Sequence, residues 1–344
     1  MKINNFELGK GKTFIIAELS ANHNQNLDVA IELIQKAHWA GADAIKIQTY
    51  RPDTITIDSD KDYFMLKDTI WKGQTLYNLY EKAYTPWEWT QNLKEEANKL
   101  GMIFFSSPFD VTAVDFLENV GVPVYKVASF EITDHILLKK IAHTGKPVIV
   151  STGMASLGDI ASAIKVLKEN GCQDIALLKC TSSYPAKPEQ ANLITIPNLA
   201  ETFGVFSGLS DHTLGIEVPV VSVALGAKII EKHFTLSRDN GSPDDSFSLE
   251  PHEFKQMVES VRIAEKTLGT VTYGGVDSET SSKKLRRSLF FVKDVQKGEI
   301  LTKDNVKSIR PGHGLHTKYY DSVLGYQARF NIERGTPVDW KLID

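Results

Sequence analysis

The residues with the clearest capacity for chemistry are two histidines. His212 lies in GLSDHTLG (208–215) and His233 in EKHFT (231–235), each where an apolar run gives way to polar residues. Neutral imidazoles at the ends of neighbouring strands can reach one ion and leave its other positions to water and substrate oxygens. We therefore interpret the pair as a divalent metal site. Mn²⁺ or Mg²⁺ is expected first, and Zn²⁺ or Co²⁺ would also fit.

Two lysines lie inside apolar runs, Lys46 in AIKIQTY and Lys126 in VYKVASF. A lysine in a buried strand needs a polar partner to stay charged. Small hydroxyls end several of the same runs, and a ring of hydroxyls, backbone amides and two lysines suits a phosphate or carboxylate. Any one of these serines alone could be a helix cap. The hydroxyls at the ends of these runs include Ser106 and Ser107, Ser129, Ser151 and Thr152, Thr181 and Ser182, and Ser210.

The elements that must position these residues are eight β-rich apolar runs that end in polar residues. Such runs suit parallel strands buried on both faces, and helical periodicities lie between them. The strand starts recur every 22–30 residues with one exception, which predicts a (β/α)8 TIM-type barrel with its site at the C-terminal ends of the strands. An open doubly wound sheet is the alternative, but no G-x-G-x-x-G follows the first run. The runs are 14–19, 44–50, 102–109, 124–130, 147–153, 175–183, 205–212 and 228–234.

The exception is the step from the second run to the third, which begins 58 residues later. Residues 51–84 precede the next helical pattern and are rich in aromatic residues, among them Trp71, Tyr77 and Tyr80. A loop of this length is typical of an active-site lid or of an element packed against another subunit. Residues 51–84 could serve as both.

The composition changes after Gly269, which ends the predicted barrel domain of residues 1–269. Residues 270–285 are rich in Gly, Ser and Thr and predict a linker. Residues 286–344 contain short strands and glycine turns that predict a small β-rich domain. So small a core is marginal alone, so we expect this domain to dock on another surface.

Composition excludes several classes of function. The net charge of −4, from 39 basic and 43 acidic residues, gives no footprint of nucleic-acid or membrane binding. No apolar run approaches the ~18 residues of a membrane helix, and the polar N-terminus lacks the pattern of a signal peptide. Cys172 and Cys180 fit neither a disulfide framework nor a zinc pattern, so a cytoplasmic protein is expected.

An ordered series of motifs now identifies a family. The chain resembles the sialic acid synthase family over essentially its whole length, including the antifreeze-like (SAF) domain at its C-terminal end. The resemblance implies a transferase that condenses phosphoenolpyruvate with an acylamino sugar to give a nine-carbon nonulosonic acid. The motifs are AELSANHN (17–24), KIQTY (46–50), FFSSPFD (104–110), YKVASFEIT (125–133), STGM (151–154), CTSSYP (180–185), GLSDHT, EKHFT and IRPGHG (309–314).

Within this family the chain is most similar to the pseudaminic acid synthases. ELSANHN, ASFEIT, KIQTY with the following PDTIT, and AYTPWEW all resemble that type. The resemblance implies 2,4-diacetamido-2,4,6-trideoxy-L-altrose as the sugar. N-acetylneuraminate or legionaminic acid synthesis by the same mechanism is the alternative.

The resemblance also implies the anion and metal ligands. His212 and His233 would bind the metal. The residues that would hold phosphoenolpyruvate are Lys46, Ser107, Ser129, Ser151, Ser182 and Ser210, with Lys126 close to the anion.

Other matching positions would contact the sugar. Glu18, Gln48 and Asp244 are implied there, although GSPDDSFS (241–248) departs from the family pattern and leaves Asp245 as an alternative to Asp244. Arg310 would reach into the site of a second subunit and touch an N-acetyl group. That arrangement implies a domain-swapped homodimer.

Glu131, two residues beyond Ser129, is our candidate for proton transfer. Two other classes of function remain in view. A Schiff-base pyruvate aldolase would use Lys46 or Lys126, and a non-catalytic sugar- or ice-binding protein is suggested by the antifreeze-like tail. The eight polar strand ends argue against a pure binding protein, which has no need of metal ligands beside an anion site.

Overall fold

The first unit of the chain is a closed barrel of eight parallel strands, as the sequence predicts. The computed structural model describes residues 1–67 and 70–344, and residues 1–269 form this unit. The order around the barrel is β10-β3-β4-β5-β6-β7-β8-β9, and β10 pairs with β3 to close it. The strands are β3 (Phe14–Glu18), β4 (Ala44–Thr49), β5 (Ile103–Pro108), β6 (Tyr125–Val127), β7 (Val148–Ser151), β8 (Ile175–Cys180), β9 (Phe206–Asp211) and β10 (Ile229–His233).

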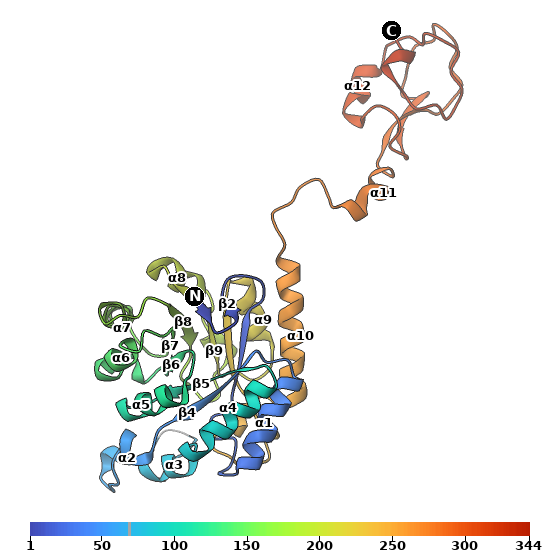
Figure 1. Ribbon diagram of the computed structural model, residues 1–344. Coiled ribbons are helices and arrows are strands. Elements are labelled where there is room, and N and C mark those ends of the chain that lie inside the picture. The colour runs from blue at the N-terminus through green and yellow to red at the C-terminus, as the bar shows by residue number, and fades with distance from the viewer. Residues whose placement is uncertain (68–69) are drawn as a thin grey trace. The chain divides into compact units, whose positions relative to one another are not determined.

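Helices surround the barrel and alternate with its strands (Figure 1). Their starts are set by polar caps: Asn26, Asp110 and Asp134 each accept hydrogen bonds from backbone amides of the first turn that follows. The caps are thus not the serines of the predicted ring. The helices are α1 (Leu27–Trp39), α2 (Pro52–Ile55), α3 (Leu76–Ala83), α4 (Thr90–Lys99), α5 (Val111–Val120), α6 (His135–Ala142), α7 (Leu157–Glu169), α8 (Thr195–Phe203), α9 (Glu217–Ala224) and α10 (Pro251–Leu268).

Several predicted strands end earlier than the sequence pattern suggested. β6 stops at Val127, so Ser129 lies in a turn and Glu131 begins a 3-10 helix, Glu131–Thr133. The amide of Glu131 donates to the carbonyl of Ala128, which closes that turn and ends strand pairing. Likewise β8 ends at Cys180, before Ser182. These residues still lie at the C-terminal end of the barrel, on loops rather than on strands.

A short N-terminal hairpin was not predicted. β1 (Lys2–Ile3) pairs antiparallel with β2 (Phe6–Glu7). The Phe6 ring packs on Phe14 at 4.6 Å between centroids, and Ile3 and Leu8 join the barrel core. Two-residue strands carry too little periodicity to be recognised from sequence.

The long segment after β4 contains α2 and α3 and lies beside the C-terminal end of the barrel. Met65 pairs with Thr75 in an isolated antiparallel bridge, and Thr75 then caps α3 by accepting from the amide of Asn78. The predicted loop 51–84 is therefore mostly structured, and its residues 68–69 lie outside the described part of the chain.

The second unit comprises residues 270–344 and has its own small core. Its one antiparallel pair of named strands is β11 (Ser288–Phe291) with β12 (Val306–Ile309), and isolated bridges extend it. The short helices α11 (Thr280–Lys283) and α12 (Tyr320–Val323) accompany them, so the predicted linker contains one helical turn. In the described chain, no helix has both the length and the apolar content to cross a membrane.

Candidate active site

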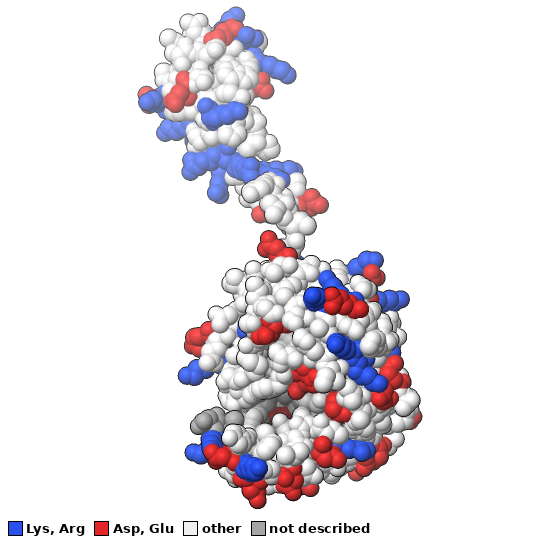
Figure 2. Space-filling view, turned by 90° about the vertical axis from the view of Figure 1, so that its left-hand side faces the viewer, with Lys and Arg blue, Asp and Glu red and all other residues white. Residues whose placement is uncertain are grey.

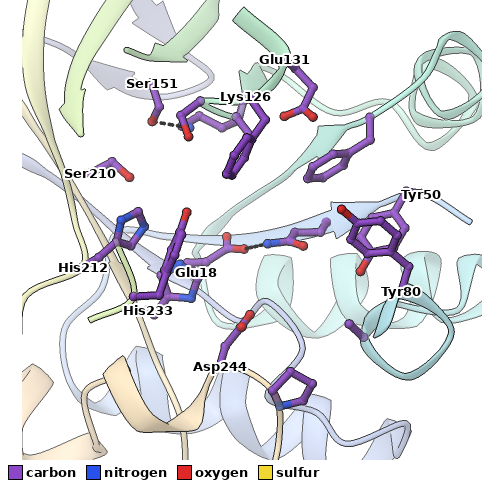
Figure 3. Close-up of a pocket in the computed structure, with 18 of the residues that line it drawn as sticks. Glu18, Tyr50, Tyr80, Lys126, Glu131, Ser151, Ser210, His212, His233 and Asp244 are labelled. Carbon is purple, nitrogen blue, oxygen red and sulfur yellow. Dashed lines mark hydrogen bonds between the residues drawn. The ribbon is translucent and has the colours of Figure 1, made fainter. Parts of the chain in front are cut away.

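A cavity of about 500 Å³ opens at the C-terminal ends of the barrel strands. The space-filling view shows the hollow on one face of the barrel unit (Figure 2), and the close-up shows polar side chains pointing into it from several strands (Figure 3). Most of the predicted site residues line it: Glu18, Lys46, Gln48, Lys126, Ser129, Glu131, Ser151, Ser210, His212, His233 and Asp244.

Three predicted residues do not line the cavity. Ser107 is fully buried and accepts a hydrogen bond from Lys46 Nζ at 3.2 Å, so it supports the lysine from behind. Ser182 shares a hydrogen bond of 2.8 Å with the Ser129 hydroxyl. Arg310 is exposed in the second unit, directly after β12. Ser107 and Ser182 therefore each contact a residue that lines the cavity, rather than lining it themselves.

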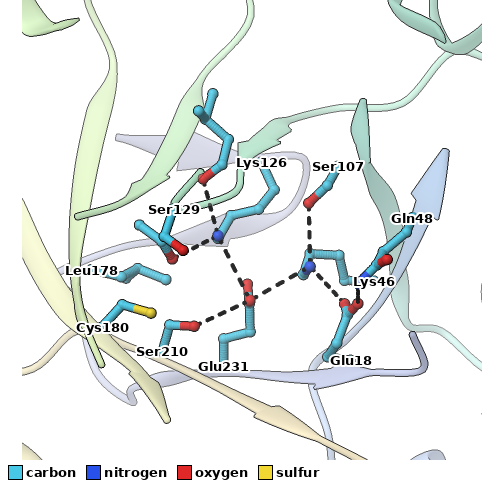
Figure 4. Close-up of polar contacts among 12 residues, drawn as sticks. Glu18, Lys46, Gln48, Ser107, Lys126, Ser129, Leu178, Cys180, Ser210 and Glu231 are labelled. Carbon is cyan, nitrogen blue, oxygen red and sulfur yellow. Dashed lines mark hydrogen bonds and ion pairs between the residues drawn. The ribbon is translucent and has the colours of Figure 1, made fainter. Parts of the chain in front are cut away.

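The floor of the cavity is a chain of four buried ionic side chains of alternating sign (Figure 4). Lys46 Nζ lies 2.7 Å from Glu18 Oε2 and 3.5 Å from Glu231 Oε1. Lys126 Nζ lies 3.7 Å from the same Glu231 oxygen and donates to the Ser151 hydroxyl at 2.7 Å. Adjacent strands bring three of these groups together, since β10, β3 and β4 are neighbours, and Lys126 reaches Glu231 from β6.

Each pKa in this chain follows from burial set against its neighbours. Burial lowers the pKa of Lys46, but the carboxylates of Glu18 and Glu231 outweigh burial and raise it. Burial raises the pKa of Glu231, but Lys126 and Lys46 outweigh that and hold it low. Burial dominates at Lys126, whose pKa is lowered, and at Glu18, whose pKa is raised. Glu231 is therefore the carboxylate held most firmly in its ionised form.

The two histidines come together as the sequence predicted. Their ring centroids are 5.3 Å apart. His212 Nδ1 lies 2.8 Å from the carbonyl of Thr181, which can only accept, so Nδ1 carries a proton. Burial lowers the pKa of His212, but Cys180 and the Thr181 carbonyl outweigh burial and raise it, so Nε2 offers a lone pair only in the neutral ring. Burial holds the pKa of His233 well below its ordinary value, and its Nδ1 has no hydrogen-bond partner among the described residues.

These features fit a bound divalent ion. A metal-binding histidine typically donates its other N–H to a carbonyl, as His212 does, and a neutral imidazole with an unpartnered buried nitrogen needs a ligand. Within residues 1–67 and 70–344 no group of three or more His, Cys, Asp or Glu side chains could hold an ion alone. The protein would therefore supply two nitrogens, and water and substrate oxygens would complete the coordination.

A series of hydrogen bonds connects Glu18 in the floor to the other predicted sugar contacts. Gln48 Nε2 donates to Glu18 Oε1 and to the Ser20 hydroxyl, both at 3.1 Å, and Ser20 donates to Asp244. The structure also separates the two aspartates of GSPDDSFS. Asp244 lines the cavity, whereas Asp245 is buried behind it and accepts from the Thr235 hydroxyl at 2.6 Å.

Glu131 stands at the edge of the cavity with its carboxyl group pointing inward (Figure 3). Burial raises its pKa from the ordinary 4.5 to about 7. Its Oε2 has no partner in the described chain. A carboxyl group that titrates near neutral pH and is free to bond a ligand is suited to proton transfer.

Sequence reasoning missed several cavity residues. Glu231 lies two residues before His233 and so shares its face of β10, which is a signal that could have marked it. Tyr184 packs against His212 with 4.4 Å between ring centroids, and Phe247 packs against His233 at 4.9 Å. Tyr50 and Tyr80 line the side of the cavity away from the histidines, and no local pattern places them there.

Comparisons with known proteins match both units of the chain. The NeuB family model matches residues 33–273, and the SAF domain model matches residues 286–344. A pseudaminic acid synthase of Campylobacter jejuni is 47% identical over 338 residues, covering 97% of this chain and 97% of that protein. An N,N'-diacetyllegionaminic acid synthase of the same species is 39% identical over 326 residues, covering 94% and 97%.

A solved structure extends this likeness to three dimensions. The N-acetylneuraminic acid (sialic acid) synthetase of Leptospira borgpetersenii, in complex with citrate, has a TM-score of 0.73 and 34% identity to this chain. The match covers 82% of this chain and 94% of that one.

The ionic floor yields a first prediction. Glu231→Gln leaves Lys46 and Lys126 with one fewer buried counter-charge, so the free energy of unfolding should fall by about 3 kcal/mol. The double variant Glu231→Gln/Lys126→Met removes one charge of each sign and should recover part of that loss. Urea unfolding at pH 7 measures both, with exposed Glu259→Gln as control. Equal stability of the single variant and the wild type would contradict the described charge pairing.

The raised pKa of Glu131 yields a second prediction, on stability against pH. Between pH 4.5 and about 7 the unfolded chain releases this proton while the folded protein retains it, so wild-type stability falls as pH rises through that window. Glu131→Gln removes the effect. The variant's stability relative to wild type should therefore be about 2 kcal/mol more favourable at pH 8 than at pH 5. Urea unfolding of both proteins at both pH values measures it; no change with pH would show an ordinary carboxyl group.

Proposed function

The chain belongs to the NeuB family, and from that premise we propose that it is a pseudaminic acid synthase. It condenses phosphoenolpyruvate with 2,4-diacetamido-2,4,6-trideoxy-L-altrose and releases phosphate. The observation that carries the proposal is the single cavity into which two lysines, several serine hydroxyls and a histidine pair converge. The higher identity to the pseudaminic than to the legionaminic acid synthase supports the choice of sugar.

The anion site follows from the charges of the floor. Lys126, with Ser129, Ser151 and Ser210 around it, would bind the phosphate and carboxylate of phosphoenolpyruvate. Lys46, held by Glu18 and Ser107, would contact the same ligand from the neighbouring side. Groups fixed before the substrate arrives need no reorganisation when charge develops, which is the main source of electrostatic catalysis.

The metal would be held by His212 Nε2 and by His233. When bound, a divalent ion, foremost Mn²⁺ or Mg²⁺, polarises the aldehyde oxygen of the open-chain sugar. The sugar would be oriented by Glu18, Gln48 and Asp244 so that its C1 faces C3 of phosphoenolpyruvate. The hydroxyl of Ser20 links Gln48 to Asp244 by hydrogen bonds. Holding both substrates in one cavity makes their reaction effectively unimolecular.

The protein's chemical task is proton transfer. C3 of phosphoenolpyruvate forms the new bond to C1 of the sugar, water then adds to C2, and the C–O bond to phosphate breaks. Glu131 would accept the proton of the adding water; its carboxyl group faces the cavity and its pKa is about 7, which supports this role. Phosphate release distinguishes this reaction from a Schiff-base aldolase, in which Lys46 or Lys126 would act as a nucleophile.

We also propose that the second unit acts in a domain-swapped homodimer, in which Arg310 touches an N-acetyl group in the partner's site. The exposure of Arg310 directly after β12 supports this, because an exposed guanidinium is available to an external ligand.

The function is tested by phosphate release from phosphoenolpyruvate with Mn²⁺. The protein should release phosphate with the diacetamido-trideoxy-altrose and much more slowly with N-acetylmannosamine or the legionaminic acid precursor. EDTA should abolish release, and added Mn²⁺ should restore it. Faster release with another sugar would replace the proposed substrate, and no release with any sugar would overturn the proposed function.

The proposed role of Glu131 has its own test. Glu131→Gln keeps the size and polarity of the side chain but cannot accept a proton, so kcat should fall roughly 10²- to 10⁴-fold while KM for both substrates stays within a few-fold. Steady-state kinetics measures the two constants separately. A wild-type kcat would remove Glu131 from the mechanism.

A further inference from the structure

The side of the cavity away from the histidines is apolar. Six side chains form this apolar wall, and all but one come from the segment between β4 and α4: Ile55, Leu66, Leu76, Leu79, Ala83 and Phe109. Burial of methyl groups against such a surface is favourable, whereas a ligand's hydroxyl groups would lose their water there without gaining partners. The wall therefore suits a ligand substituent that carries methyl groups.

Two phenol groups interrupt the apolar wall. The rings of Tyr50 and Tyr80 pack edge to face with 5.5 Å between centroids, and Phe109 packs on Tyr50 at 5.1 Å, which fixes the rings. No group in residues 1–67 or 70–344 hydrogen-bonds either hydroxyl. Burial raises the pKa of both tyrosines, so both keep their protons and can donate. The wall thus offers hydrogen bonds to one isolated polar group.

The segment that carries most of the apolar wall is anchored to the sugar-contacting loop. Trp71 Nε1 donates to the carbonyl of Pro243 at 3.0 Å, and Pro243 directly precedes Asp244. On the other side, Trp87 Nε1 donates to the carbonyl of Tyr50 at 3.1 Å. The wall and the polar contacts of the predicted sugar site are therefore held as one unit, so the same ligand can touch both.

An acylamino group matches these features. Its carbonyl oxygen accepts hydrogen bonds, and its methyl group is apolar, so one substituent uses both the phenols and the wall. We propose that the apolar wall, with Tyr50 and Tyr80, is the subsite for the second acetamido group of the acceptor sugar, with Tyr80 donating to its carbonyl. This inference rests on the proposed function and adds to it the residues that select a diacetamido sugar over a sugar with a hydroxyl at C4.

The test combines a change in the enzyme with a change in the substrate. Tyr80→Phe removes one hydroxyl and keeps the ring that packs on Tyr50. For the diacetamido sugar, KM should rise roughly 3- to 10-fold with kcat nearly unchanged, as expected for one lost neutral hydrogen bond. The KM for phosphoenolpyruvate should not change. Steady-state phosphate release measures all three constants.

The substrate change is the analogue with a hydroxyl at C4. Wild type should have a lower kcat/KM for this analogue than for the diacetamido sugar. In Tyr80→Phe the ratio of the two kcat/KM values should be roughly 3- to 10-fold smaller. The reason is that the enzyme change and the substrate change remove the same hydrogen bond, so their effects are not additive. Tyr77→Phe is the matched control: it is the same substitution on the same helix α3, at a residue that does not line the cavity. It should behave as wild type.

The outcomes distinguish a failure of the proposed subsite from a failure of the proposed function. If wild type is active with the diacetamido sugar and Tyr80→Phe keeps both its KM and its discrimination at C4, this inference is overturned and the proposed function stands. If wild type releases no phosphate with this sugar, the proposed function fails, and this inference fails with it. A fall in discrimination for Tyr77→Phe equal to that for Tyr80→Phe would also overturn the subsite.

Discussion

The structure of the site depends on the buried chain Glu18–Lys46–Glu231–Lys126. None of the four residues has more than 5% of its surface exposed, so each charge needs the neighbouring opposite charge. Glu231 is the central member, because both lysines approach the same oxygen of its carboxylate. The barrel makes this chain feasible by placing β10, β3 and β4 side by side and letting Lys126 reach inward from β6. Removing one partner of such a set leaves an uncompensated buried charge.

The same chain limits what the floor can bind by itself. Its two carboxylates and two ammonium groups sum to zero when all are ionised, so an incoming phosphate must compete with Glu231 for both lysines. The histidine pair lies at the ends of β9 and β10, next to Glu231 on the same strand. A divalent cation there would add the positive charge that the floor lacks. Anion binding and metal binding are therefore expected to support each other.

The sequence predicted most of the fold, because buried parallel strands and amphipathic helices leave strong periodic signals. It also predicted the histidine pair and both lysines, since the histidines lie at the ends of such strands and the lysines interrupt their apolar runs. The sequence could not predict which polar side chains line the cavity and which lie behind that lining. Ser107 and Ser129 look alike in sequence, yet Ser107 supports Lys46 from behind and Ser129 faces the cavity. Which of two hydroxyls reaches a ligand depends on strand tilt and side-chain packing, and neither is local.

The apolar wall was beyond sequence reasoning for a related reason. Tyr80 belongs to α3, whose position over the barrel is fixed by contacts with Tyr50 and by the bridge from Met65 to Thr75. Nothing in the residues around Tyr80 distinguishes it from Tyr77, which lies three positions earlier on the same helix and does not line the cavity. Only the folded arrangement shows which of the two can contact a substrate.

Unsatisfied polar atoms give an independent reason to regard this cavity as the active site. Among the described residues, the buried side-chain atoms without a hydrogen bond belong to Glu18, Asp110, Glu131, Glu231 and His233. The Glu18 atom is Oε2, which is nonetheless ion-paired with Lys46. All but Asp110 line the cavity. Buried polar groups are almost always hydrogen-bonded in folded proteins, because leaving one unpaired costs about 1–3 kcal/mol. Their concentration in one cavity, which also carries the apolar wall, means that the fold retains this cost at the place where a ligand with both polar and apolar groups can remove it.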